Sequence, residues 1–208
     1  MWDGIENTGW GVHDASATVW KDLMGMANIT LHNAQIYSDH IYFPQVNGYG
    51  EAAFPQSYGA IEVVLSKNVR TNNSAYYSNI ICIGTTYSGY GLCAPRGFLT
   101  DTYDVETAPY VSISDGELFS ATLNKSGPST IAIAKNGAMG ADGELASGSR
   151  YASGSNSING SSTSTRNSDL WIRSIRLYSH VLTAEEIAAN YAVDKARFNL
   201  PRCDVIVR

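Results

Sequence analysis

Two acidic residues in the middle of the chain have the spacing that cleavage of a glycosidic bond would need. Asp104 and Glu106 in TYDVETAP lie two positions apart, and residues two apart on a strand point to the same face. A retaining hydrolase holds two carboxyl groups about 5 Å apart, one as nucleophile and one as general acid. Pro109 follows closely and favours a turn, so solvated loop carboxylates are the better interpretation. The other glutamates offer no better spacing.

Residues that serve other reactions show no suitable spacing either. The histidines are His13, His32, His40 and His180, and they lack the spacing of metal ligands. No glycine-rich phosphate loop precedes a helix, and no cysteine lies beside a His that would suggest a nucleophile. We therefore expect that the protein is not an enzyme.

Aromatic residues in expected loops offer a different chemistry, the stacking of a ring on the apolar face of a pyranose sugar. The candidates are Trp10 in NTGWGVHD, Tyr87 and Tyr90 in TTYSGYG, and Tyr103 in LTDTYDVE. Neighbouring Asn, Asp and Gly residues supply groups that bond sugar hydroxyls. The alternative is that each ring is partly buried and covers an edge of the fold. Trp20 and Trp171 lie in apolar segments, and we assign them to the core.

Composition excludes several classes of protein. The 208 residues carry a formal net charge of -5 with scattered Lys and Arg, so we expect no nucleic-acid surface. No apolar run approaches the roughly 20 residues that span a bilayer, and the first residues do not resemble a secretory signal. The chain contains 16% charged residues, 19 glycines and 13 tyrosines, which favours short strands joined by turns.

Alternating apolar residues predict where the strands lie. In AIEVVL the inward set is Ile61, Val63 and Leu65. Further strands are expected in NIICIG, YVSIS, LFSATL and TIAIAK, with turns at Asp115-Gly116, Ser126-Gly127-Pro128 and Asn136-Gly137.

The segment 140–169 is rich in Gly, Ser, Asn and Thr, as a linker between domains would be. Only about forty residues follow it, too few for an independent core. We therefore expect surface loops around a short strand near 157–160, inside one domain that covers residues 1–208, and we expect this domain to be excised from a longer protein.

The odd number of cysteines leaves at least one thiol without a partner in the chain. They are Cys82, Cys93 and Cys203. A turn near Tyr87–Gly91 would bring Cys82 and Cys93 roughly opposite each other on a hairpin. A cross-strand disulfide is one interpretation, and two small buried side chains is the favoured one.

The segment LWIRSIRLYSHVLTAEEIAANYAVDKARF changes from strand period to helix period. Strand alternation places Trp171, Ile175 and Leu177 on one face, and Ile172, Ser174, Arg176 and Tyr178 on the other. His180 is then a polar residue at the corner between strand and helix. This strand is expected inside a sheet.

A capping box formed by Thr183 and Glu186 predicts where the helix begins, and the helix should end before FNLP. Helix period places Ile187, Ala188 and Tyr191 inward, and Glu185, Asn190 and Asp194 outward. A helix of about four turns is marginally stable alone, so we expect it to lie against the sheets or their edge.

Three stretches resemble the laminin-G-like (concanavalin A-like) jelly-roll domains of bacterial surface proteins, secreted carbohydrate-active proteins and phage virion proteins. WDGIENTG with TVWKDLMGMANITLHNA is similar to the family's opening segments, GAIEVVLS to its first long core strand, and the strand–helix segment to its close. Met24 stands where the family usually has Ser, and the Gly/Ser-rich part matches nothing beyond loop composition. The resemblance implies an all-β fold, a two-sheet antiparallel jelly-roll sandwich with one C-terminal amphipathic helix.

The resemblance also implies two kinds of site to test. Related glucanases carry a Glu-x-Asp-x-x-Glu pattern on one strand, and none of the glutamates here begins it. Laminin-G-like domains often hold Ca²⁺ through loop oxygens, for which Asp101 and Asp104, or Asp142 and Glu144, offer hard ligands. Neither pair matches a defined calcium loop, and Asp also makes ordinary turns.

The sequence favours a non-catalytic carbohydrate-binding or adhesion module on a bacterial surface or phage particle, outside the cell and not inserted in a membrane. Its expected partner is a glycan or cell-surface polysaccharide. The alternative is a structural or decoration domain of a virion or surface assembly that contacts other proteins. A glycoside hydrolase is the third hypothesis, because this fold hosts all three roles.

Overall fold

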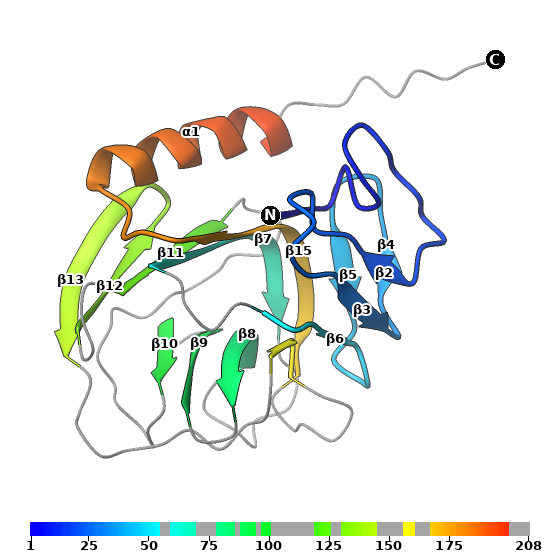
Figure 1. Cartoon of the computed structure of the whole chain (residues 1–208), viewed down its shortest axis with the longest axis horizontal. Helices are drawn as coiled ribbons and strands as arrows, with labels where there is room; N and C mark the ends of the chain where they lie inside the picture. The colour runs from blue at the N-terminus through cyan, green and yellow to red at the C-terminus, as the bar shows by residue number, and fades with distance from the viewer. Residues whose placement is uncertain are drawn as a thin grey trace.

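In the residues that it describes, the computed structural model consists of two packed β-sheets and one helix (Figure 1). The described residues are 1–54, 59–69, 78–85, 88–94, 97–100, 119–125, 130–144, 156–160 and 167–199. The expected strand YVSIS and the expected turns at Asp115-Gly116 and Ser126-Gly127-Pro128 lie outside them.

The first sheet is the one that carries the helix. In spatial order its strands are β13 (Ala138–Glu144), β12 (Thr130–Lys135), β11 (Phe119–Lys125), β7 (Ala60–Val69), β15 (Asp169–Tyr178), β5 (Ile41–Phe43) and β4 (Gln35–Ile36), and β1 (Trp2–Asp3) also pairs with β15. The two longest strands, β7 and β15, pair along their length near the middle of the sheet.

The second sheet packs against the inner face of the first. Its order is β10 (Gly97–Thr100), β9 (Ser88–Ala94), β8 (Ser78–Thr85), β14 (Ser157–Ile158), β6 (Tyr49–Glu51), β3 (Ile29–His32) and β2 (Val19–Trp20). All strand pairs among the described residues are antiparallel. The expected short strand near 157–160 is β14.

The core lies between the sheets, and β7 contributes the predicted set. Ile61, Val63 and Leu65 all belong to one buried apolar cluster with strands of the second sheet, because alternate residues of a strand face the same side. Trp20 is fully buried as expected, and its indole Nε1 donates to the carbonyl of Asp3 at 2.8 Å. This bond joins β2 to β1 across the two sheets.

A bulge in β15 changes which residues face the core. The register with β7 shifts on both sides of Ile172, so Leu170 and Ile172 face inward before the shift and Ile175 faces inward after it. The predicted grouping of Trp171 with Ile175 was therefore wrong. Trp171 is half-buried on the outer face, where Arg176 also lies, and it is not a core residue.

The helix α1 (Ala184–Asn199) lies across the outer face of the first sheet, on the side away from β8, β9 and β10 (Figure 1). The capping box is confirmed: the amide of Thr183 donates to the Glu186 carboxylate at 2.8 Å, and the amide of Glu186 donates to Thr183 Oγ1 at 3.2 Å. The helix includes Phe198 and ends later than the sequence indicated.

The face of α1 that packs on the sheet is more polar than the helical spacing of its apolar residues predicted. Ile187 packs against Ala60 and Ala134, and Phe198 packs against Val64. Asp194, expected in solvent, is fully buried, and Ala188, expected inside, is exposed. Asn190 was also expected outward, but it contacts the sheet.

The β12–β13 and β8–β9 hairpins differ in detail from what the sequence predicted. Asn136 and Gly137 form the expected turn with positive φ angles of 52° and 79°, and β13 then continues to Glu144, where loop was predicted. In the β8–β9 hairpin, Cys82 lies opposite Gly91 and Cys93 lies opposite Asn79. The two cysteines are therefore not cross-strand neighbours, and Cys82 is buried.

Candidate functional site

A tight turn near the start of the chain displays Trp10. The amide of Val12 donates to the carbonyl of Gly9 at 3.0 Å, and Gly11 has a φ of 70°, which a residue with a side chain rarely adopts. Trp10 is 63% exposed at the tip of this turn. Its indole Nε1 donates to the carbonyl of Leu23 at 3.0 Å. The ring is therefore fixed in orientation while much of its surface faces solvent.

Asp22 fixes the shape of the loop that contains Leu23. One oxygen of its carboxylate accepts from the ammonium of Met1 at 2.7 Å and from the amide of Met24, and the other accepts from the amides of Met26 and Ala27. Burial opposes the charge on Asp22, but these donors outweigh it and hold the pKa of Asp22 below its usual range. The carbonyl of Leu23 is thus presented from a loop with a fixed shape.

Exposed apolar side chains gather on the two loops around this ring. Val12 lies on the turn of Trp10, while Met24 and Met26 lie on the Asp22 loop, and all three are exposed, Met26 to 76%. We call Trp10, Val12, Met24 and Met26 the Trp10 surface. An exposed apolar group of this kind on a loop is a common feature of binding surfaces.

Polar groups follow Trp10 within a few residues. The buried side chain of Asn7 donates to the carbonyl of Asp14 at 2.7 Å and accepts from its amide at 2.8 Å, which fixes this limb of the loop. The carboxylate of Asp14 is exposed and accepts from the hydroxyl and the amide of Ser16, which hold the pKa of Asp14 below its usual value. His13, also exposed, bonds the carbonyl of Ile5. These groups can accept or donate hydrogen bonds to a polar ligand.

No described contact brings the other candidate site residues to the Trp10 surface. Tyr87, Tyr103, Asp101, Asp104 and Glu106 lie outside the described residues. Tyr90 belongs to β9, where its backbone lies between Ile83 of β8 and Thr100 of β10. The stacking role of the three tyrosines and the calcium role of the aspartates stay predictions.

Two further findings concern metals and membranes. In the described part of the chain, no three His, Cys, Asp or Glu side chains gather in a way that could hold a metal ion. No helix among these residues is long and apolar enough to cross a membrane.

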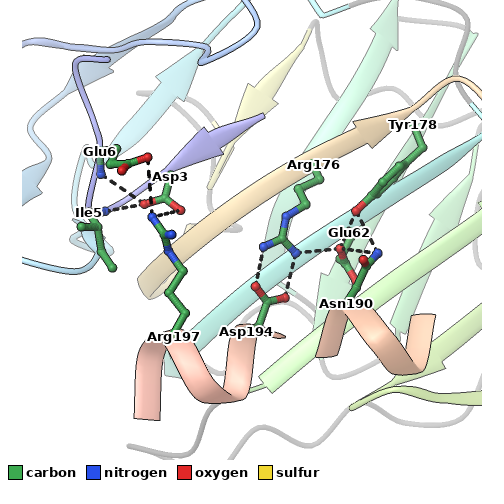
Figure 2. A network of polar contacts seen from close by, with 9 residues as sticks. All are labelled: Asp3, Ile5, Glu6, Glu62, Arg176, Tyr178, Asn190, Asp194 and Arg197. Atoms are coloured by element: carbon green, nitrogen blue, oxygen red, sulfur yellow. Dashed lines mark hydrogen bonds and ion pairs between the residues drawn. The ribbon is translucent and has the colours of Figure 1, made fainter. Parts of the chain in front are cut away.

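A network of charged and polar side chains lies between α1 and the first sheet (Figure 2). The sequence did not predict it. Arg176 of β15 donates to Glu62 of β7 at 2.8 Å and makes a two-pronged contact with the carboxylate of Asp194. Tyr178 donates to the same Glu62 oxygen at 2.9 Å, and Asn190 donates to the Tyr178 hydroxyl at 2.9 Å. One signal in the sequence was available, namely a charged residue inside each of two strands that pair, Glu62 with Arg176.

The electrostatics of this network favour a structural role. Burial opposes the charge of Arg176, but its bonds with Asp194 and Glu62 outweigh burial and raise its pKa. Burial and the charge of Glu62 also raise the pKa of Tyr178. Both carboxylates are fully buried beneath the helix, so they hold α1 on the sheet and are not open to a substrate.

Comparisons with known proteins bear on the fold. No sequence-family profile matches the chain, and a comparison with characterised protein sequences finds no match. Solved structures do match. A Trypanosoma rangeli sialidase superposes with a TM-score of 0.65 at 16% identity over 88% of this chain and 32% of that one. The botulinum neurotoxin serotype D binding domain superposes with a TM-score of 0.61 at 16% identity over 82% of this chain and 48% of that one.

The strand pairing and these likenesses confirm the predicted fold class, a two-sheet antiparallel sandwich with a C-terminal helix. Identities of this size carry information on fold alone. The chain spans about a third of the sialidase chain and about half of the neurotoxin binding-domain chain.

Proposed function

We propose that this chain is a non-catalytic carbohydrate-binding or adhesion module, with the Trp10 surface as its contact region. The observation that carries the proposal is an indole that is 63% exposed and yet fixed by its bond to the carbonyl of Leu23. A fixed ring loses little conformational freedom when a ligand stacks on it, so more of the contact energy appears as affinity. The likeness of the fold to parts of a sialidase and a neurotoxin binding domain supports the proposal.

In this proposal the indole covers the apolar C–H face of a pyranose ring, and nearby polar groups bond its hydroxyls. The exposed carboxylate of Asp14 is suited to accept from hydroxyl donors, and His13 is its neighbour on the same limb. The wider proposal follows the resemblance to laminin-G-like domains: a module displayed outside the cell, on a bacterial surface or a phage particle, with cell-surface polysaccharide as its partner.

A second candidate function is a structural or decoration domain that contacts protein. The specific observation in its favour is the apolar character of Met24, Met26 and Val12, because flexible methionines suit protein contacts better than sugar hydroxyls. Replacing both methionines with Ser should abolish a protein contact or self-association, measured by light scattering after gel filtration. The same change should leave stacking on Trp10 in place.

The glycoside hydrolase hypothesis has its own test. It requires release of reducing sugar that disappears in Asp104→Asn or Glu106→Gln, and our proposal expects no release from the parent protein.

The main experiment is a glycan-array screen of the parent protein and three variants, with and without EDTA. Trp10→Ala should remove up to about 90% of the signal at protein concentrations below Kd, since loss of a stacking contact of about 1.4 kcal/mol lowers affinity tenfold. Trp10→Phe keeps a ring and should retain part of the signal. Val193→Ala on α1 is the matched control, because Val193 is also 63% exposed and lies on a different element.

Each arm of this screen has a defined meaning. An undiminished signal in Trp10→Ala would overturn the assignment of the Trp10 surface, and no signal from any glycan would overturn carbohydrate binding itself. A loss with EDTA in the parent protein would support the calcium site predicted at Asp101 and Asp104.

A further inference from the structure

A group of nearly parallel aromatic rings lies on the outer face of the first sheet, at the end where β5 and β4 form its edge. Tyr37 and His40 belong to the turn that joins these strands, and Trp171 lies on β15 directly opposite Tyr42 of β5. Ile41 and Phe43, the neighbours of Tyr42, face the core, so Tyr42 and its partner Trp171 face outward. We call Tyr37, His40 and Trp171 the Tyr37 platform.

The rings of the platform are stacked. The centroids of Tyr37 and His40 are 4.7 Å apart with planes 8° from parallel, and those of His40 and Trp171 are 4.6 Å apart at 20°. His40 is only 7% exposed, whereas Tyr37 is 46% exposed. The stack therefore supports an aromatic ring that faces solvent.

The turn that carries Tyr37 is held from several sides. The amide of Tyr37 donates to the carbonyl of His40 at 2.9 Å, and the Tyr37 hydroxyl donates to Gln35 at 3.1 Å. A side chain at Gly4 would come within 2.8 Å of both the Asp39 carbonyl and the Cα of His40, so the β1 end packs tightly behind the turn. Tyr37 is thus fixed before any ligand arrives, as Trp10 is.

The charges beside the platform are already paired. Asp39 bonds His40 at 2.7 Å and pairs with Arg173, whose guanidinium lies 5.6 Å from the centre of the Phe198 ring at the end of α1. The bonds from His40 and Arg173 outweigh burial and hold the pKa of Asp39 well below its usual range. A charged ligand would therefore find no unpaired opposite charge here, whereas a neutral ligand does not need one.

Some hydrogen-bonding capacity is left unused at the same place. Among the described residues, Nε2 of His40 and Nε of Arg173 have no hydrogen-bond partner, although both atoms are buried. Most buried polar atoms in proteins are bonded, so ordered water is expected to satisfy these two atoms.

We propose that the Tyr37 platform is a second carbohydrate site, which takes a neutral hexopyranose by stacking on Tyr37. The inference rests on the proposed function for the class of ligand, but it depends on different residues in a different part of the fold. Its consequence is that one chain contacts a polysaccharide at two points, which raises the effective affinity without a stronger contact at either.

The test is titration calorimetry and saturation-transfer NMR with cellotriose, maltotriose and chitotriose, and with 3′-sialyllactose as the acidic comparison. Tyr37→Ala should weaken binding of a neutral trisaccharide about tenfold, and Tyr37→Phe should retain it because the stacking ring remains. The matched control is Tyr49→Ala, since Tyr49 stacks on His32 at 4.3 Å and 11° but lies on the second sheet and is half-buried. Circular dichroism melting of each variant separates loss of binding from loss of fold.

The variants are also combined with Trp10→Ala so that the two proposals fail separately. Binding that survives Trp10→Ala and is lost when Tyr37→Ala is added supports the platform. Loss of all binding in Trp10→Ala alone overturns the platform and leaves the Trp10 surface standing. Equal weakening by Tyr37→Ala and Tyr49→Ala, or preference for 3′-sialyllactose, also overturns it. No binding of any neutral probe to the parent protein also overturns the platform, while the glycan array decides on the Trp10 surface.

Discussion

Removal of one carboxylate under α1 tests whether the buried network holds the helix on the sheet. Asp194→Ala takes away the group that makes two contacts with Arg176, at a position that is fully buried. Breaking a buried ion pair typically costs about 3–5 kcal/mol, because the remaining charge has lost its partner. Arg176 keeps Glu62 at 2.8 Å, so we expect the lower end, about 3 kcal/mol. For a chain of this length this lowers Tm by about 6–12 °C.

Arg176→Met is the more severe change in the same network. It leaves two fully buried carboxylates, Glu62 and Asp194, without their common cation. We expect a loss near the upper end, about 5 kcal/mol at pH 7.

Urea denaturation followed by circular dichroism measures both effects, with midpoint and slope reported separately. Lys195→Ala, next to Asp194 in sequence but exposed, is the control and should stay within about 0.5 kcal/mol of the parent. If Asp194→Ala falls within 1 kcal/mol of the parent, or destabilises more than Arg176→Met, the network does not act as the electrostatic anchor of the helix.

Two further outcomes follow from contacts of the first sheet. A chain that ends before Thr183 loses the cover of Ala60 and Val64, so its Tm should fall well below that of the parent, and an unchanged Tm would show that α1 contributes nothing to stability. Burial, together with the hydrogen bond and charge of Asp169, raises the pKa of Tyr42 to about 12, against about 10 in an unfolded chain. The folded state therefore holds this proton more tightly, and its contribution to stability is complete below about pH 10 and is lost as the pH rises through about 12. Tyr42→Phe should flatten the fall of the urea midpoint between pH 10 and 12, and Tyr49→Phe serves as the control; the same fall in both would contradict the assignment.

Local patterns in the sequence predicted the parts of the fold that neighbouring residues determine. The alternation of Ile61, Val63 and Leu65 is a property of one strand, and the capping box of Thr183 and Glu186 closes within one turn of helix. Both were confirmed, as was the two-sheet class. Trp10 was expected in a loop and lies exposed in one, while its role in binding stays a proposal.

Features that depend on distant partners could not be predicted in the same way. Asp194 was expected in solvent because helix period alone assigns charged residues to the outer face, but the surface beneath it contains Arg176 and Glu62. The bulge in β15 changes which side of the sheet the following residues face. Strict alternation assumes that no residue is inserted in the strand, so it placed Trp171 on the same face as Ile175, in the core. The Tyr37 platform combines a turn with a strand more than a hundred residues later in the chain.

The place of β15 has a consequence for the order in which the molecule can form. This strand joins β7 on one side to β5 and β1 on the other, and it follows every other described strand in the chain. The earlier halves of its sheet remain separate, each with an open edge, until residues 169–178 arrive and join them. Contacts between such remote segments close slowly, so folding is expected to pass through a stage at which these edges can pair with other chains.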